Sequence, residues 1–180
     1  HQGDIDIAKR LIDIAAAAGC NAVKFQKRNP DICVPEDQKL KPRSWQGKDM
    51  TYLEYKYKVE FGKEEYDEID SYCNQQGIKW SASPWDLDSL GFLSQYNIPF
   101  IKLPSAMLTN DELLEGCIAT GKQVIFSTGM STQEEIDHAV GILRKAKNKY
   151  NNPYKVGLLH CNSTYPSPIE ELNLSGIKTL

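Results

Sequence analysis

The chain has 180 residues, 41% hydrophobic and 25% charged, and its formal net charge at pH 7 is −3. This composition is typical of a folded globular protein and excludes a disordered chain, and the balance of charge gives no electrostatic footprint for nucleic acid. No run of about 18 apolar residues occurs, and the start HQGDIDIAKR does not resemble a signal peptide, so we expect a cytoplasmic protein without a membrane segment. The five cysteines are widely spaced without a C-x-x-C pair, which favours reduced thiols.

The hydrophobic periodicity predicts helices and strands in alternation along the chain. Residues 4–18 have helical spacing and end at Gly19, and a strand is expected next. A long polar stretch then extends to about residue 60, and its length indicates a functional loop over a site. The expected strands are 21–26, 78–83, 99–105, 123–128 and 155–161; the expected later helices are 63–76, 86–96, 110–120 and 132–149, with a last helical start near 168.

This alternation, with short strands that are apolar on both faces, predicts an α/β protein with a parallel sheet covered by helices. We expect residues 1–180 to form a partial (β/α)8 TIM barrel that lacks its first strand and its last units. The start HQGD is typical of a loop that feeds a helix, and the chain stops inside a predicted helix. A doubly wound sheet is the alternative, but it normally carries a Gly-rich first turn, and no G-x-G-x-x-G occurs.

Polar residues stand at the carboxyl end of every expected strand, where a (β/α)8 barrel places its active site. In VIFSTGMS, for example, an apolar strand passes directly into polar residues. Two lysines and several hydroxyls converging on one mouth predict a site for phosphate or carboxylate. The STQE that follows, with Ser131 and Glu134, is predicted to be a capping box whose helix amides favour negative charge. The strand-end residues are Lys24 and Gln26; Ser81 and Ser83; Lys102 and Ser105; Ser127 and Thr128; and His160, Asn162, Ser163 and Tyr165.

Each of these residues also has a purely structural interpretation. Lys24 and Lys102 could belong to ion networks, but a lysine within a buried strand is costly without an anion, which favours function. Residues 127 and 128 alone could close a turn, and His160 is as consistent with a core histidine as with a catalytic one. Cys161 has no evident base beside it, so a small core residue is the favoured interpretation.

Several motifs resemble, in order, those of the sialic acid synthase family: HQGD, AGCNAVKFQK, SASPWD, FIKLPS, VIFSTGMS and LHCNSTYPSP. The resemblance implies a transferase with a (β/α)8 fold that condenses phosphoenolpyruvate with an N-acylated mannosamine-type sugar. It implies that Lys24, Lys102, Ser105 and Ser127 hold the phosphate and carboxylate of phosphoenolpyruvate. Ser83 stands near that site, at a position where many members have threonine.

The resemblance also places Gln26, Ser163 and Tyr165 in the lining of the phosphoenolpyruvate and sugar pocket. Many bacterial members have asparagine where Ser163 stands. A divalent metal, Mn²⁺ or Mg²⁺, is implied as well, but the strand-one glutamate, the SDHT-type motif and the second histidine that bind it in the family do not occur in residues 1–180. We therefore assign no metal ligand here and expect a partial protein.

Other functions and partners stay open from the sequence. An aldolase of the same barrel type would use a Schiff-base lysine, for which Lys102 is a candidate. A non-catalytic binding protein is the third alternative. The acceptor sugar is not fixed by any motif, and residues 27–60 are the expected determinant because they form the one long insert beside the site. A homodimer is also open for the full-length protein.

Overall fold

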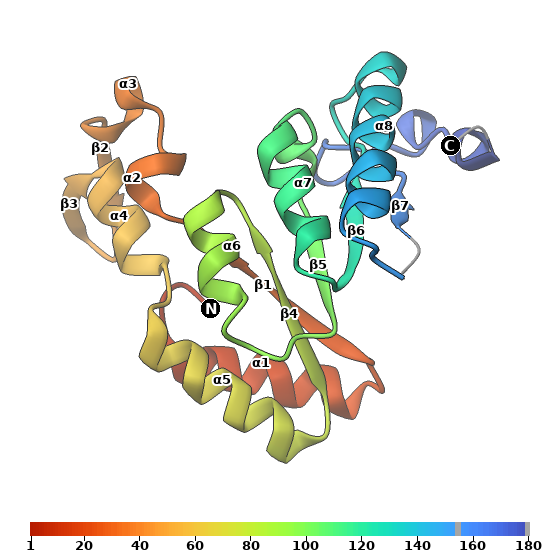
Figure 1. The fold of residues 1–180 in the computed structure, drawn as a ribbon. Helices are drawn as coiled ribbons and strands as arrows, with labels where there is room; N and C mark the ends of the chain where they lie inside the picture. The colour runs from red at the N-terminus through yellow and green to blue at the C-terminus, as the bar shows by residue number, and fades with distance from the viewer. Residues whose placement is uncertain (154–155, 179–180) are drawn as a thin grey trace.

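The computed structural model describes residues 1–153 and 156–178, and its central feature is a layer of parallel strands. β1 (Ala22–Lys27) pairs with β4 (Lys79–Pro84), and β5 (Phe100–Leu103), β6 (Gln123–Ser127) and β7 (Gly157–Leu159) form a second parallel sheet. β4 and β5 lie side by side, and the Ser81 hydroxyl donates to the Phe100 carbonyl between them. These strands run in one direction (Figure 1), so their carboxyl ends share one edge.

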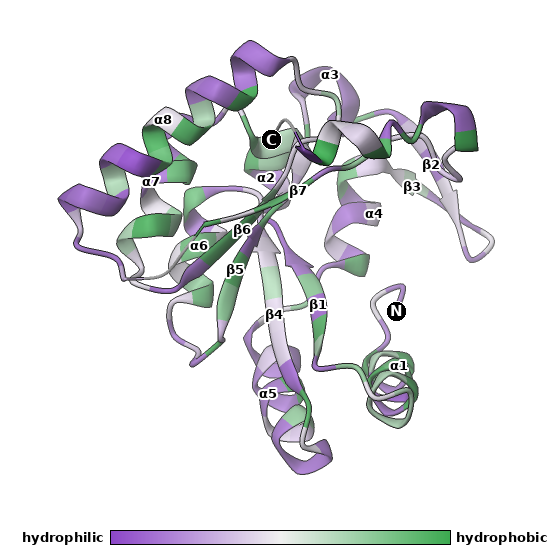
Figure 2. Ribbon diagram, turned by 90° about the vertical axis from the view of Figure 1, so that its right-hand side faces the viewer, coloured by the Kyte–Doolittle hydropathy of each residue, from purple (hydrophilic) through white to green (hydrophobic). Residues whose placement is uncertain are grey.

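The helices that alternate with these strands cover one face of the layer. They are α1 (Ile5–Ala17), α5 (Lys63–Gln76), α6 (Leu87–Leu93), α7 (Asp111–Ala119) and α8 (Gln133–Lys149). Every second strand residue points toward them, and Ala82, Ile101, Leu103, Val124 and Phe126 are buried there. Figure 2 shows α7 and α8 beside strands β5 and β6, with much of the outer side of both helices hydrophilic. The apolar residues therefore face the helices, and the alternate positions are left for other side chains.

The helices begin and end at the signals expected from the sequence. The side chain of Asp4 caps α1 by accepting from the amide of Ile7, and Asp86 caps α6 in the same way. α5 ends at Gly77, whose φ of 67° is left-handed and therefore suits glycine. The predicted α/β alternation is confirmed, with boundaries that shift by only a few residues. Residue 155 of the expected strand 155–161 lies outside the described residues, and β7 itself spans Gly157–Leu159.

The expectation of one long loop up to residue 60 is wrong. The insert contains α2 (Pro30–Cys33), α3 (Glu36–Lys39), an antiparallel hairpin of β2 (Pro42–Trp45) and β3 (Lys48–Thr51), and α4 (Tyr52–Val59). Aromatic contacts hold it together, because Tyr55 packs on Trp45 and Tyr52 with ring centroids 6.2 and 6.1 Å apart. The insert is therefore a small ordered structure beside the carboxyl ends of the strands (Figure 1).

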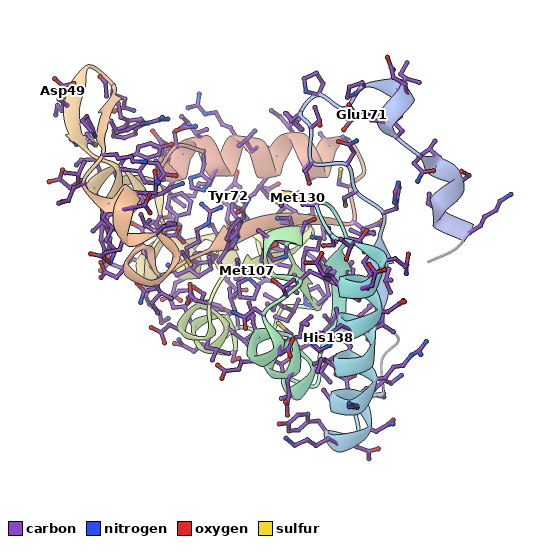
Figure 3. The ribbon with its side chains drawn as sticks, turned by 90° about the horizontal axis from the view of Figure 1, so that it is seen from above. Asp49, Tyr72, Met107, Met130, His138 and Glu171 are labelled. Atoms are coloured by element: carbon purple, nitrogen blue, oxygen red, sulfur yellow. The ribbon has the colours of Figure 1, made fainter. Side chains whose placement is uncertain are left out.

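The carboxyl-terminal part also differs from its prediction. In place of a helix near residue 168 there are short 3-10 turns, η2 (Ile169–Glu171) and η3 (Leu174–Lys178); another, η1 (Ser105–Met107), follows β5. Seen from above in Figure 3, the hairpin that carries Asp49 and the segment that carries Glu171 lie on opposite sides of the molecule. Among the described helices, none is both long and apolar enough to span a bilayer.

Candidate functional site

The strand face opposite the helices carries the polar residues predicted from the sequence. The β1–β4 register sets Lys24 opposite Ser81 and Gln26 opposite Ser83. Opposed residues in parallel strands share a face, and the alternate residue Phe25 packs against Tyr66 toward the helices. The predicted side chains of β1 and β4 therefore share the face that points away from the helices.

The same alternation places Lys102 and Ser127 on this face. Their neighbours Leu103 and Phe126 are fully buried beneath the helices. Ser127 is itself only 5% exposed, and it lies at the end of β6 where the chain turns toward α8. The structure thus brings both predicted lysines and the predicted serine to one face and one edge.

Among the described residues, no carboxylate pairs with either of the two lysines. Lys24 Nζ donates to Ser83 Oγ at 3.2 Å, and Lys102 Nζ donates to the Leu103 carbonyl at 2.8 Å. Burial, together with the charge of Lys24, lowers the pKa of Lys102 to about 8, and burial and the charge of Arg28 lower the pKa of Lys24. Two ammonium groups that destabilise each other favour an anion between them.

Hydroxyls and a backbone amide approach one another closely at the carboxyl ends of β5 and β6. The Gly129 amide donates to Ser105 Oγ at 3.1 Å. A Cβ atom on Gly129 would lie 2.6 Å from Ser163 Oγ, 3.0 Å from Ser105 Oγ and 3.4 Å from the Cβ of Cys161. Cys161 is also among the groups that influence the pKa of Lys102, which links this region to Lys102. We refer to Ser105, Gly129 and Ser163 as the Gly129 cradle.

Other predicted strand-end residues serve different contacts. Thr128 Oγ1 donates to the Leu159 carbonyl at 3.2 Å, and a ring nitrogen of His160 lies 2.8 Å from the Leu172 carbonyl. Asn162 donates to the Glu171 carbonyl at 3.2 Å. The side chain of Tyr165 is fully exposed and lines none of the described cavities. The structure brings Ser163 close to Gly129, but it does not bring Tyr165 there.

Sequence reasoning missed Arg28, which lies just beyond the end of β1. Its Nη2 donates to the side-chain oxygen of Gln26, and its guanidinium stacks on the ring of Trp85 at 4.1 Å. The spacing could have identified it, because a residue two positions after Gln26 lies on the same face of an extended strand. Arg28 therefore adds a third cation beside the two lysines.

The described residues do not form a metal centre. Within residues 1–153 and 156–178, no group of three or more His, Cys, Asp or Glu side chains is placed to hold an ion. Glu60, which lines the same cavity as Lys24, pairs with Lys27 at 3.4 Å and accepts from the Arg28 amide. The buried Asp86 accepts from Asn29 and Ser89 and is fully used as a cap.

Comparison with known proteins identifies the family of this chain. The sequence profile of the NeuB family matches residues 11–180. The chain belongs to the NeuB family. It is 32% identical over 182 residues to the N,N'-diacetyllegionaminic acid synthase of Campylobacter jejuni, and 34% identical over 185 residues to the N-acetylneuraminate-9-phosphate synthase of Drosophila melanogaster. Each alignment covers 100% of this chain, and respectively 54% and 47% of the relative.

A solved structure of a similar protein extends the match to three dimensions. The N-acetylneuraminic acid synthetase of Leptospira borgpetersenii, crystallised with citrate, superposes with a TM-score of 0.84 and is 33% identical. The alignment covers 99% of this chain and 56% of that one. The chain therefore spans about half the length of the NeuB-family relatives it matches.

The pKa of Lys102 predicts how anion binding depends on pH. Only the ammonium form attracts a phosphate or carboxylate, so Lys102 contributes fully below its pKa of about 8 and progressively less above it. Affinity for a phosphate or carboxylate ligand is expected to fall above this pH, by up to about tenfold for each pH unit per lost proton. Calorimetric titrations from about pH 7 to pH 9.5 test this. In Lys102→Arg the guanidinium stays charged, and the decline should lessen; a wild-type affinity that is flat over this range would contradict the prediction.

A second prediction distinguishes the role of Ser127 from that of the residue that caps α8. The cap is Thr132, not Ser131 as the sequence suggested. The capping box is formed by Thr132 and Glu135, whereas the Ser131 hydroxyl donates to the Gly129 carbonyl at 3.4 Å. Thr132→Ala should lower the free energy of unfolding by about 0.5 to 2 kcal/mol with normal ligand affinity. Ser127→Ala should lower affinity for a phosphate or carboxylate ligand with little change in melting temperature. Thermal melts and titrations of both variants decide, and equal stability losses with unchanged affinity would assign Ser127 to the turn alone.

Proposed function

We propose that this chain is the phosphoenolpyruvate-binding part of a synthase that makes a sialic-acid-type nonulosonic acid. The observation that carries the proposal is the gathering of Lys24, Lys102 and the Gly129 cradle on one face, at the carboxyl ends of parallel strands. Membership of the NeuB family and the printed activities of its relatives support it. The strand layer would then be part of a (β/α)8 barrel whose mouth is this edge.

The reaction joins C3 of phosphoenolpyruvate to the aldehyde carbon of an N-acyl hexosamine. Water adds at C2, and phosphate leaves by cleavage of the C–O bond, so a 2-oxo acid and inorganic phosphate are formed. Lys24 and Lys102 attract the donor's negative charges, and the Gly129 cradle gives its phosphate or carboxylate a fixed orientation. The Ser83 hydroxyl accepts a hydrogen bond from Lys24 Nζ and thereby orients that ammonium group. These roles are positioning and electrostatic.

A divalent metal would supply polarisation of the acceptor aldehyde. Its ligands are proposed to lie outside residues 1–180, where the resemblance to the synthase family places them. The chain's own contribution is to bind the donor and to fix its orientation.

The proposal is tested by phosphate release in the full-length protein with phosphoenolpyruvate and N-acyl hexosamines, with and without Mn²⁺. Phosphate should appear only when donor and acceptor are both present. Borohydride with pyruvate is the control for the aldolase alternative, since a Schiff base on Lys102 would be reduced to a stable adduct and a synthase should not be trapped. A trapped pyruvate adduct without phosphate release would favour the aldolase over the synthase. Binding of phosphoenolpyruvate without phosphate release would favour a non-catalytic binding protein.

A further inference from the structure

A cavity of about 530 Å³ extends from the lysine face toward the insert. One end runs between α1 and β1. The other end is polar, and its lining is formed by Lys24, Gln26, Arg28, Tyr55, Lys56 and Glu60. Arg28, Lys56 and Glu60 also line an adjoining cavity of about 190 Å³ beneath α2. The insert therefore contributes charged groups to a space that begins at Lys24.

The charges at this polar end do not balance. Arg28 and Lys56 form no ion pair with a carboxylate among the described residues. Glu60 pairs with Lys27 at 3.4 Å and accepts from the backbone amide of Arg28 at 2.9 Å. Partly buried cations without a counter-charge are costly, so this end of the cavity favours an anionic ligand.

Both cations are held in place by aromatic rings. The Arg28 guanidinium stacks on Trp85 at 4.1 Å, and its Nε is buried with no hydrogen-bond partner within the described chain. Lys56 Nζ lies 4.9 Å from the ring centre of Tyr52 and 5.7 Å from that of Tyr55. A planar guanidinium with free donors suits the oxygens of a phosphate group, and an ammonium adds a second point charge.

We propose that Arg28 and Lys56 form a second anion subsite, which binds a phosphate group carried by the acceptor sugar. The inference rests on the proposed synthase function. The donor's two anionic groups are already matched by Lys24, Lys102 and the Gly129 cradle, whereas Lys56 comes from α4 on the insert side. A neutral sugar needs hydroxyl partners but no unpaired cations. The acceptor class is therefore a phosphorylated N-acyl hexosamine.

The test compares N-acetylmannosamine with N-acetylmannosamine 6-phosphate in the full-length protein. At saturating phosphoenolpyruvate, kcat/KM measured by phosphate release should favour the phosphorylated sugar. Lys56→Gln should reduce that preference by about tenfold or more, the lower part of the range for a charge-assisted hydrogen bond. Lys56 is the main position because Arg28 also packs on Trp85, and its replacement could disturb folding. Lys58→Gln, at an exposed position of the same helix, should leave the preference unchanged.

Calorimetry with the two sugars, with phosphoenolpyruvate present, keeps the inference separate from the proposed function. If phosphate is released with the unphosphorylated sugar at equal or higher kcat/KM, the subsite is wrong and the synthase stands. If neither sugar supports release, the synthase is wrong, and the subsite is then judged by binding alone. Tighter binding of the phosphorylated sugar that is lost in Lys56→Gln supports the subsite, and equal binding of both sugars overturns it.

Discussion

Lys102→Met is expected to weaken phosphoenolpyruvate binding by about 1.5 to 3 kcal/mol, the range for a hydrogen bond to a charged group. Its ammonium has no carboxylate partner in the described chain and lies near a second ammonium, so an anionic ligand relieves an unfavourable arrangement. Lys24→Met should have a similar effect. Calorimetry with phosphoenolpyruvate measures the loss directly, and kcat/KM measures it in the full-length enzyme.

The burial of Lys102 also predicts how Lys102→Met affects stability. Burial disfavours the charged form of Lys102 in the folded protein, as its lowered pKa shows, so an apolar side chain of similar length should not destabilise the fold. Melting temperature should hold or rise while affinity falls. Lys79→Met is the matched control, because Lys79 is exposed at the opposite end of the neighbouring strand β4 and should leave affinity unchanged. Unchanged affinity in both Lys24→Met and Lys102→Met would overturn the assignment of this site.

The helices and parallel strands could be predicted because their signals are local. Alternating apolar residues in β5 and β6, and a stop such as Gly77, need no knowledge of distant contacts. The α4 helix was missed although Thr51 and Glu54 form a capping box that the sequence displays as T-x-x-E. Its polar and aromatic composition hides the periodicity, and the aromatic packing that stabilises it involves the hairpin, which is not visible in a local window.

The cap of α8 shows how precisely a helix start can be predicted from the sequence. STQEE contains two overlapping frames, and the structure uses Thr132 with Glu135 instead of Ser131 with Glu134. Met130 has a φ of 65°, and this left-handed residue carries the chain into the helix one position later than expected. The positions of Lys24 and Lys102 at the carboxyl ends of expected strands were enough to predict that they share one site. The stacking of Arg28 on Trp85 and the close approach of side chains to Gly129 depend on tertiary packing. A local sequence pattern could not predict either of them.

Gly129→Ala is expected to disrupt the cradle with a large loss of donor affinity. The added Cβ would lie 2.6 Å from Ser163 Oγ and 3.0 Å from Ser105 Oγ, distances at which one partner must move. Overpacking of this kind costs about 1 to 3 kcal/mol, and here it falls on the hydroxyls that would bind the ligand. We expect phosphoenolpyruvate affinity to fall by about tenfold or more. Calorimetry measures the affinity, and thermal melts measure any change in stability.

Gly141→Ala is the control for this substitution, because Gly141 lies within α8 and a Cβ there meets nothing within 4 Å. Removing a glycine from a helix interior should raise stability by about 0.5 to 1 kcal/mol and leave affinity unchanged. Adding Ser163→Gly to Gly129→Ala removes the closest contact and should restore part of the lost stability, while the missing hydroxyl keeps donor affinity below that of the wild type. If Gly129→Ala binds phosphoenolpyruvate as tightly as Gly141→Ala does, the Gly129 cradle does not hold the donor, and the anion must be bound by the lysines without it.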